Sequence, residues 1–316
     1  MIDFFQDQYD RVTGWLFEAL LQPAMYHLGF MNWADEAFQW MDFFVFGVIQ
    51  VMVVAAVCLP LEHWRPVERW ESRRLVWTDV TYTLLARLGI LPMLGFILFY
   101  AASSRIEGLI ADSGFVPPTL ETLIPGLREA PLLALALYIV ILDFAEYWRH
   151  RLQHMFPWWW ALHSIHHAQT QMTFWTDDRN HILDDIIAAA WFGIIAVAIG
   201  VPPGQFPIIL MVLRLAESLS HANVRLDFGR VGERMLVSPR FHRLHHGVLS
   251  VGNAGKNYGV LLPVWDWIFG TADFERGHYP RTGDPDAPPA YVKGGWFAQQ
   301  VVGLREVWRA ITARRA

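Results

Sequence analysis

Cysteine and lysine are almost absent from this chain of 316 residues. The one cysteine, Cys58, lies inside an apolar run. A single thiol excludes a disulfide within the chain, a cysteine-ligated zinc site and a cysteine-bound iron–sulfur cluster. The two lysines are Lys256 and Lys293, and 25 basic residues against 30 acidic ones give a formal net charge of −5. Because nucleic-acid binding needs a basic surface, no nucleic-acid partner is expected.

The N-terminal stretch MIDFFQDQYD lacks the positive charge that begins a secretory signal, so we expect no cleavable signal peptide. Hydrophobic residues make up 54% of the chain, and they are gathered in runs. Soluble domains contain about 45–50% apolar residues. The composition therefore predicts an integral membrane protein.

The apolar runs predict an all-α, multi-pass helical bundle with about four membrane spans. A helix needs about 20 apolar residues to cross a bilayer, which residues 38–61, 77–101 and 131–149 supply. Residues 185–200 and 205–220 are shorter and form a hairpin, for which full crossing and re-entry both remain open. Arginines in the loop after the first span place that loop, and the histidine-rich cap on the same side, in the cytoplasm.

Eight of the 13 histidines stand in three short boxes, HRLQH, HSIHH and HRLHH. On a helix, residues three and four apart share a face. Neutral imidazole is a common metal ligand, and eight nitrogens exceed the four or six that one ion accepts. The sequence therefore predicts a dinuclear metal site in the cap. The expected ligands are His150, His154, His163, His166, His167, His242, His245 and His246.

Two further histidines are weighed as ligands. His221 ends the last apolar run on the same membrane face, and we expect it to be the ninth ligand rather than a helix-end histidine beside the helix dipole. His181 is a candidate tenth ligand, against a hydrogen bond to a ligand or simple solvent exposure.

Carboxylates before the first box are candidates for orienting the metal-bound imidazoles. Asp143 and Glu146 precede His150 by seven and four residues, so they share its face. Metal-bound imidazoles usually donate their second N–H to a carboxylate or carbonyl, and we assign both carboxylates that role. The alternative is ion pairing with Arg87 or Arg149. A polar group beside the second box could either orient imidazoles or cap the next helix; its members are Asp177, Asp178, Arg179 and Asp184.

An all-imidazole site suits iron, zinc or copper. A pair of redox metals beside lipid favours oxygen chemistry on an alkyl chain. Two alternatives come from other classes. A zinc-dependent membrane hydrolase would need a catalytic carboxylate such as Glu146 and would act without O2. A bis-histidine membrane haem protein would place isolated histidines within facing spans.

The three boxes, in this order and spacing, resemble those of the fatty acid hydroxylase/sterol desaturase superfamily. The flanking segments DFAEYWRHR, SPRFHRLHH and NYGVLLPVWDWIFGT are similar as well. The resemblance covers about residues 130–272. It implies a membrane di-iron enzyme that hydroxylates or desaturates a lipid alkyl chain or sterol-like substrate with O2. It also implies two iron ions, which zinc readily replaces during purification.

The resemblance further implies a separate electron donor of the ferredoxin or cytochrome b5 type, since the sequence has no HPGG-type haem loop. Three regions follow from it. Residues 1–130 hold an interfacial segment and two spans, residues 131–272 form the catalytic domain, and residues 273–316 form a cytosolic tail. The expected location is a bacterial inner membrane, with the endoplasmic reticulum membrane as the alternative, and the metal site faces the cytoplasm.

Overall fold

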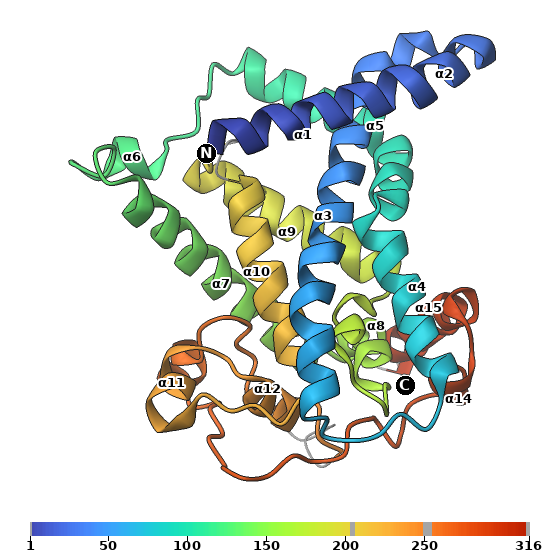
Figure 1. Cartoon of the computed structure of the whole chain (residues 1–316), viewed down its shortest axis with the longest axis vertical. Helices are drawn as coiled ribbons and strands as arrows, with labels where there is room; N and C mark the ends of the chain where they lie inside the picture. Colours follow the sequence, from blue (N-terminus) through green and yellow to red (C-terminus); the bar gives the residue numbers. More distant parts are fainter. Residues whose placement is uncertain (1, 203–205, 249–254, 314–316) are drawn as a thin grey trace.

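A computed structural model describes residues 2–202, 206–248 and 255–313, and the regular elements in these ranges are helices. The predicted all-α class is confirmed. Within the described ranges, three helical stretches are long and apolar enough to cross a membrane: Met31–Trp64, which contains α3 (Ala34–Trp64), and the helices α7 (Pro131–Met155) and α9 (Ile182–Ile199). The chain is a multi-pass membrane protein. α10 (Phe206–His221) packs between α3 and α7 (Figure 1).

The predicted span over residues 77–101, which Arg87 and Pro92 interrupt in the sequence, consists of two helices. The chain breaks at Gly89 between α4 (Arg73–Arg87) and α5 (Ile90–Asp112). Gly89 has φ 79°, a left-handed conformation that only glycine adopts without strain. Its carbonyl accepts a hydrogen bond of 3.0 Å from Nε1 of Trp40 in α3, and this bond holds the chain at the break against α3. α5 then continues to Asp112, beyond the predicted end of the span at residue 101.

The buried guanidinium of Arg87 holds the end of α4 against the rest of the protein. Arg87 ends α4 and pairs with two carboxylates of η3 (Phe174–Asp178), at 2.5 Å from Asp177 and 2.6 Å from Asp178. Those partners come from a short connection, and not from Asp143 or Glu146.

A proline turns the chain between the first two histidine boxes. α7 ends at Met155, Phe156 is extended, and α8 (Pro157–His167) begins with Pro157. Proline disfavours a helical conformation in the residue before it and fits the first position of a new helix. The chain therefore bends sharply, and the histidines of α7 and α8 face one another.

The third box lies on a short helix with its own cap. α12 (Pro239–His245) starts where the Ser238 hydroxyl accepts the Phe241 N–H at 3.1 Å. Glu233, from α11 (Gly229–Met235), accepts from that hydroxyl at 2.7 Å and pairs with Arg240. The cap and the buried ion pair fix where α12 points.

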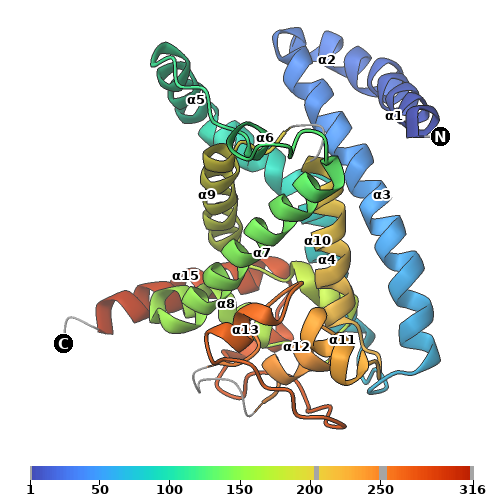
Figure 2. The same ribbon diagram turned by 90° about the vertical axis from the view of Figure 1, so that its left-hand side faces the viewer.

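The remaining elements lie at the two ends of the bundle (Figures 1 and 2). α1 (Ile2–Leu16), η1 (Phe17–Leu21), α2 (Gln22–Leu28) and η2 (Met31–Trp33) lie at the end remote from α8 and α12. α6 (Leu120–Leu123) precedes α7. α13 (Val264–Ile268), α14 (Pro289–Lys293) and α15 (Trp296–Thr312) surround the histidine end, and α15 packs along α8.

Replacing Arg87 by alanine should destabilise the protein strongly. The change would leave two buried carboxylates without their cation, and removing one partner of a buried pair costs about 3–5 kcal/mol. Thermal unfolding in detergent measures the effect, with Arg305→Ala on the exposed side of α15 as the control. Equal melting temperatures for the two variants would contradict this account of the α4 end.

Candidate metal centre

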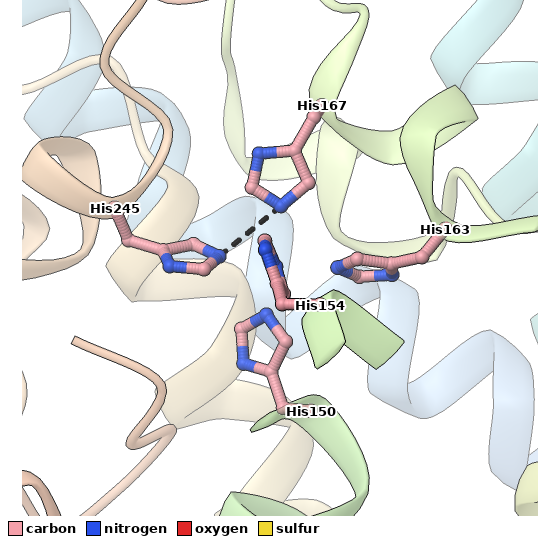
Figure 3. Close-up of side chains that lie close together, drawn as sticks. All are labelled: His150, His154, His163, His167 and His245. Carbon is pink, nitrogen blue, oxygen red and sulfur yellow. Dashed lines mark hydrogen bonds between the residues drawn. The ribbon is translucent and has the colours of Figure 1, made fainter. Parts of the chain in front are cut away.

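The structure brings the nine predicted histidines together in two buried groups. In each group, the candidate ligand nitrogens lie within 4.8 Å of one another. The first cluster is His150, His154, His163, His167 and His245; the second cluster is His166, His221, His242 and His246. Figure 3 shows the first cluster, whose rings converge from α7, α8 and α12.

The two H-x-x-H-H boxes are shared between the clusters in opposite proportions. In α8, His163 and His167 are four residues apart and face the first cluster, while His166 faces the second. The box at α12 does the reverse, with two histidines in the second cluster and His245 in the first. The clusters touch where His167 and His246 stack, with ring centroids 4.4 Å apart. One box thus reaches two neighbouring sites.

Backbone carbonyls fix the orientation of three rings. The Nδ1 atoms of His150, His221 and His245 lie 2.9, 2.7 and 2.8 Å from the carbonyl oxygens of Tyr258, Glu217 and Lys256. A nitrogen that faces a carbonyl carries the proton of a neutral imidazole, so Nε2 keeps its lone pair. Each of these rings therefore presents an unprotonated Nε2 to its cluster.

The spacing of the inward nitrogens fits metal ions. Nε2 of His221 lies 3.0 Å from Nε2 of His166 and 2.9 Å from that of His242, and the His167 and His245 Nε2 atoms are 3.1 Å apart. Two nitrogens about 2.0–2.1 Å from one ion are about 3 Å apart when their bonds are roughly perpendicular. In the described part of the chain, Nε2 of His150 has no hydrogen-bond partner. Lone pairs that converge without protons fit cations between them.

The protonation state of the histidines also suits metal binding. Burial, and after it the neighbouring imidazoles, lowers the pKa of the α8 and α12 box histidines well below its ordinary value. These histidines are His163, His166, His167, His242, His245 and His246. A metal competes with protons for imidazole nitrogen, so neutral rings bind an ion without first losing a proton.

The carboxylates assigned to orient the imidazoles make other contacts. Asp143 accepts hydrogen bonds from the Leu261 and Leu262 N–H groups and from Trp265 Nε1 at 2.8–3.1 Å. Glu146 forms a 2.5 Å ion pair with Arg149, which was the alternative reading for it. The predicted contact of these carboxylates with His150 is not observed, because the Tyr258 carbonyl takes that place.

A segment after the third box supplies two of the three orienting carbonyls, those of Lys256 and Tyr258. Asp266 accepts from the N–H groups of Tyr258 and Gly259 at 2.8 and 2.7 Å. Asn257, at φ 60°, donates from Nδ2 to the Phe241 carbonyl of α12 at 2.9 Å. Asp143 and Asp266 thus hold the backbone that faces the metal-site histidines. Asn257 and Asp266 belong to the NYG and WDW triplets, whose composition alone does not predict that they hold this backbone.

Asp184 is the carboxylate nearest to a clustered ring. Its Oδ2 lies 3.9 Å from His163 Nδ1, and it accepts hydrogen bonds from Gln153 and Trp159 at 2.6 and 2.7 Å. His181, the candidate tenth ligand, lies outside both clusters. Its Nδ1 accepts the Leu183 N–H at 3.1 Å as the N-cap of α9.

Replacing Asp266 by asparagine should weaken metal binding by about 10–100-fold, as is typical for groups that orient ligands. The amide accepts from one of the two N–H groups less well, so the Tyr258 carbonyl and the His150 ring lose their fixed position. Metal content after dialysis against graded chelator measures the change. Asp286→Asn, at an exposed site, is the matched control and should behave as the unchanged chain. Identical chelator curves would contradict the role given to Asp266.

The two clusters should differ in how much metal the protein loses when one of their histidines is replaced by alanine. Removing His154 leaves four imidazoles in the first cluster, enough for a four-coordinate ion, so two ions per chain should remain. Removing His242 leaves three in the second cluster, and the content should fall towards one ion per chain. Metal analysis of the two purified variants distinguishes these results, and equal losses would refute the division into five and four.

Comparison with known proteins identifies the chain's relatives. Residues 135–271 match the fatty acid hydroxylase family model. An ornithine lipid hydroxylase of Rhizobium tropici is 28% identical over 295 residues, which are 90% of this chain and 82% of that protein. The human alkylglycerol monooxygenase is 33% identical over 134 residues, which are 42% of this chain and 29% of the relative.

A fatty acid hydroxylase of Lecanicillium is 26% identical over 153 residues, or 43% of this chain and 41% of that protein. No solved structure matches. The chain thus spans most of the bacterial relative and under a third of the human one. Residues 135–271 include all nine clustered histidines, so the part of the chain that carries both clusters is the part that matches the fatty acid hydroxylase family.

Proposed function

We propose that this protein is a membrane-bound di-iron oxygenase that hydroxylates or desaturates a lipid alkyl chain with O2 and two electrons from a separate donor. The observation that carries the proposal is the pair of buried, all-histidine clusters at one end of the membrane-spanning helices. The relatives support a lipid substrate, because one is an ornithine lipid hydroxylase and another an alkylglycerol monooxygenase. A sterol-like substrate stays within this proposal.

Each cluster would hold one iron ion, and the pair would supply the reduction of O2 that oxidises a C–H bond. For hydroxylation, two electrons from the donor and two from the C–H bond reduce O2, with two protons, to one water and one hydroxyl oxygen in the product. The chain's own residues keep the imidazoles neutral by burial and orient them through the carbonyls of Lys256, Tyr258 and Glu217. Burial also excludes water, which protects a reactive site from side reactions.

The structure favours this function over the two alternatives. The hydrolase reading needs a free catalytic carboxylate, whereas Glu146 is held by Arg149 in an ion pair. The haem reading needs open space around two facing histidines. Around His150, three other rings have centroids within 5.3 Å, and they occupy the plane that a macrocycle would need.

We assign the catalytic region to residues 131–272, with residues 1–130 as the N-terminal interfacial and membrane part and residues 273–316 as the C-terminal segment. The cytoplasmic side of a bacterial inner membrane fits the arginine-rich loop after α3. A soluble donor of the ferredoxin type would then reach the histidine end directly. We propose iron as the native metal because both relatives' names describe oxygenation, a redox reaction that zinc does not support.

Lipid mass spectrometry of cells with and without the protein tests the proposal. A lipid that gains one oxygen atom, or loses two hydrogen atoms, should appear with the unchanged chain and be lost with His166→Ala. With 18O2 in the gas phase, the added oxygen of a hydroxylated product should carry the heavy isotope. A product that forms equally without O2 would refute the oxygenase and favour the hydrolase.

A further inference from the structure

The last helix, α15 (Trp296–Thr312), lies outside the family match and carries a stripe of exposed apolar side chains. Phe297, Leu304, Trp308 and Ile311 are 72, 49, 69 and 46% exposed. Their spacings of seven, four and three residues put them on one face of a helix. We define this face as the α15 stripe.

The other sides of α15 pack against the protein or carry charged side chains. Gln299, Gln300 and Gly303 are buried and face the protein. Arg305 and Arg309 are exposed, and Arg309 pairs with Glu306 at 2.7 Å. The helix therefore has a packed face, a charged face and an unpaired apolar face. A helix on the surface of a water-soluble cap would not be expected to carry this apolar face.

The position of α15 is fixed against the first turn of a membrane span. Gln300 accepts the Ile182 N–H at 2.9 Å, and its backbone carbonyl lies 2.9 Å from Nε2 of His181, the N-cap of α9. A Cβ at Gly303 would lie 2.3 Å from the ring of His181, so glycine permits this approach. α15 is thus held at the depth where α9 begins.

α15 meets α9 at the first turn of that helix, and α9 has exposed apolar side chains of its own. α9 is a candidate span with only 6% of its apolar window buried in the protein, and its Ile194 and Val197 are 71 and 47% exposed. Figure 2 shows α15 lying crosswise to α9 at the end where the span starts. A helix with this arrangement of apolar and basic faces lies in the plane of the membrane interface.

We propose that α15 lies on the bilayer surface, with its stripe inserted among the lipid head groups and upper acyl chains of the membrane that α9 crosses. The bilayer is the occupant that the contact of α15 with the first turn of α9, a candidate membrane span, selects. Because α15 packs along α8, the helix of His163, His166 and His167, this contact sets the depth of the metal centre relative to the lipid surface. The proposal goes beyond the proposed function and does not depend on the reaction.

Spin labels along α15 of the full chain test the proposal. Leu304→Cys and Ile311→Cys place a label on the stripe, and the neighbouring Arg305→Cys places one on the charged face. The native Cys58 is fully buried, and labelling of the unchanged chain measures its background. The labelled proteins are reconstituted in phosphatidylcholine–phosphatidylglycerol vesicles, and collision with lipid-soluble O2 is compared with collision with a water-soluble nickel chelate.

The ratio of O2 to nickel accessibility should be several-fold higher at the two stripe positions than at position 305. Equal ratios at all three positions would overturn the proposal, because the stripe would then face water. Protection of the stripe from both reagents, in detergent as well as in vesicles and with doubled particle mass, would overturn it in favour of a second copy of the chain. Neither result bears on turnover, so the oxygenase proposal is tested separately.

Discussion

The burial of nine imidazoles whose nitrogens converge in two clusters is the constraint on which the rest of this structure depends. A buried polar atom without a partner costs about 1–3 kcal/mol, and several converge here. Nε2 of His150 and both nitrogens of His163 have no hydrogen-bond partner in the described part of the chain. Such an arrangement is stable only when something else satisfies the lone pairs. Cations do so, which means that folding of this end and metal binding are thermodynamically linked.

This constraint explains why the ligands stand on short, sharply terminated helices. A long helix would carry its histidines past a compact site, since each residue adds 1.5 Å. Pro157 ends α7 and starts α8, and the Ser238 cap starts α12. The interlocking of the two H-x-x-H-H boxes follows from these breaks, because each short helix can present opposite faces to two neighbouring clusters.

The sequence predicted which histidines lie together because the signal is local. Offsets of three and four residues survive in any helix, and His221 was found from its place at a helix end. The division of the second predicted span has a local cause too. A single glycine inside an apolar run, Gly89, is compatible with a continuous helix, and its left-handed φ of 79° in the structure shows that it is a break, which Trp40 holds against α3.

The orienting groups were not predictable in the same way, because they act over long sequence distances. Asp143 shares a helix face with His150, yet it binds the N–H groups of Leu261 and Leu262. Helical spacing identifies which residues share a face and does not identify what covers that face. A backbone carbonyl, such as that of Tyr258, carries no residue signature at all.

The same reasoning accounts for His181, which spacing alone ranks beside the ligands. Its ring caps α9 through one nitrogen and meets the Gln300 carbonyl of α15 through the other, so both nitrogens are satisfied without a metal. The clustered histidines differ in having at most one nitrogen facing a backbone carbonyl. Within this chain, the clustered histidines therefore differ from His181 in how many ring nitrogens have no backbone partner. That number is set by the tertiary contacts of each ring.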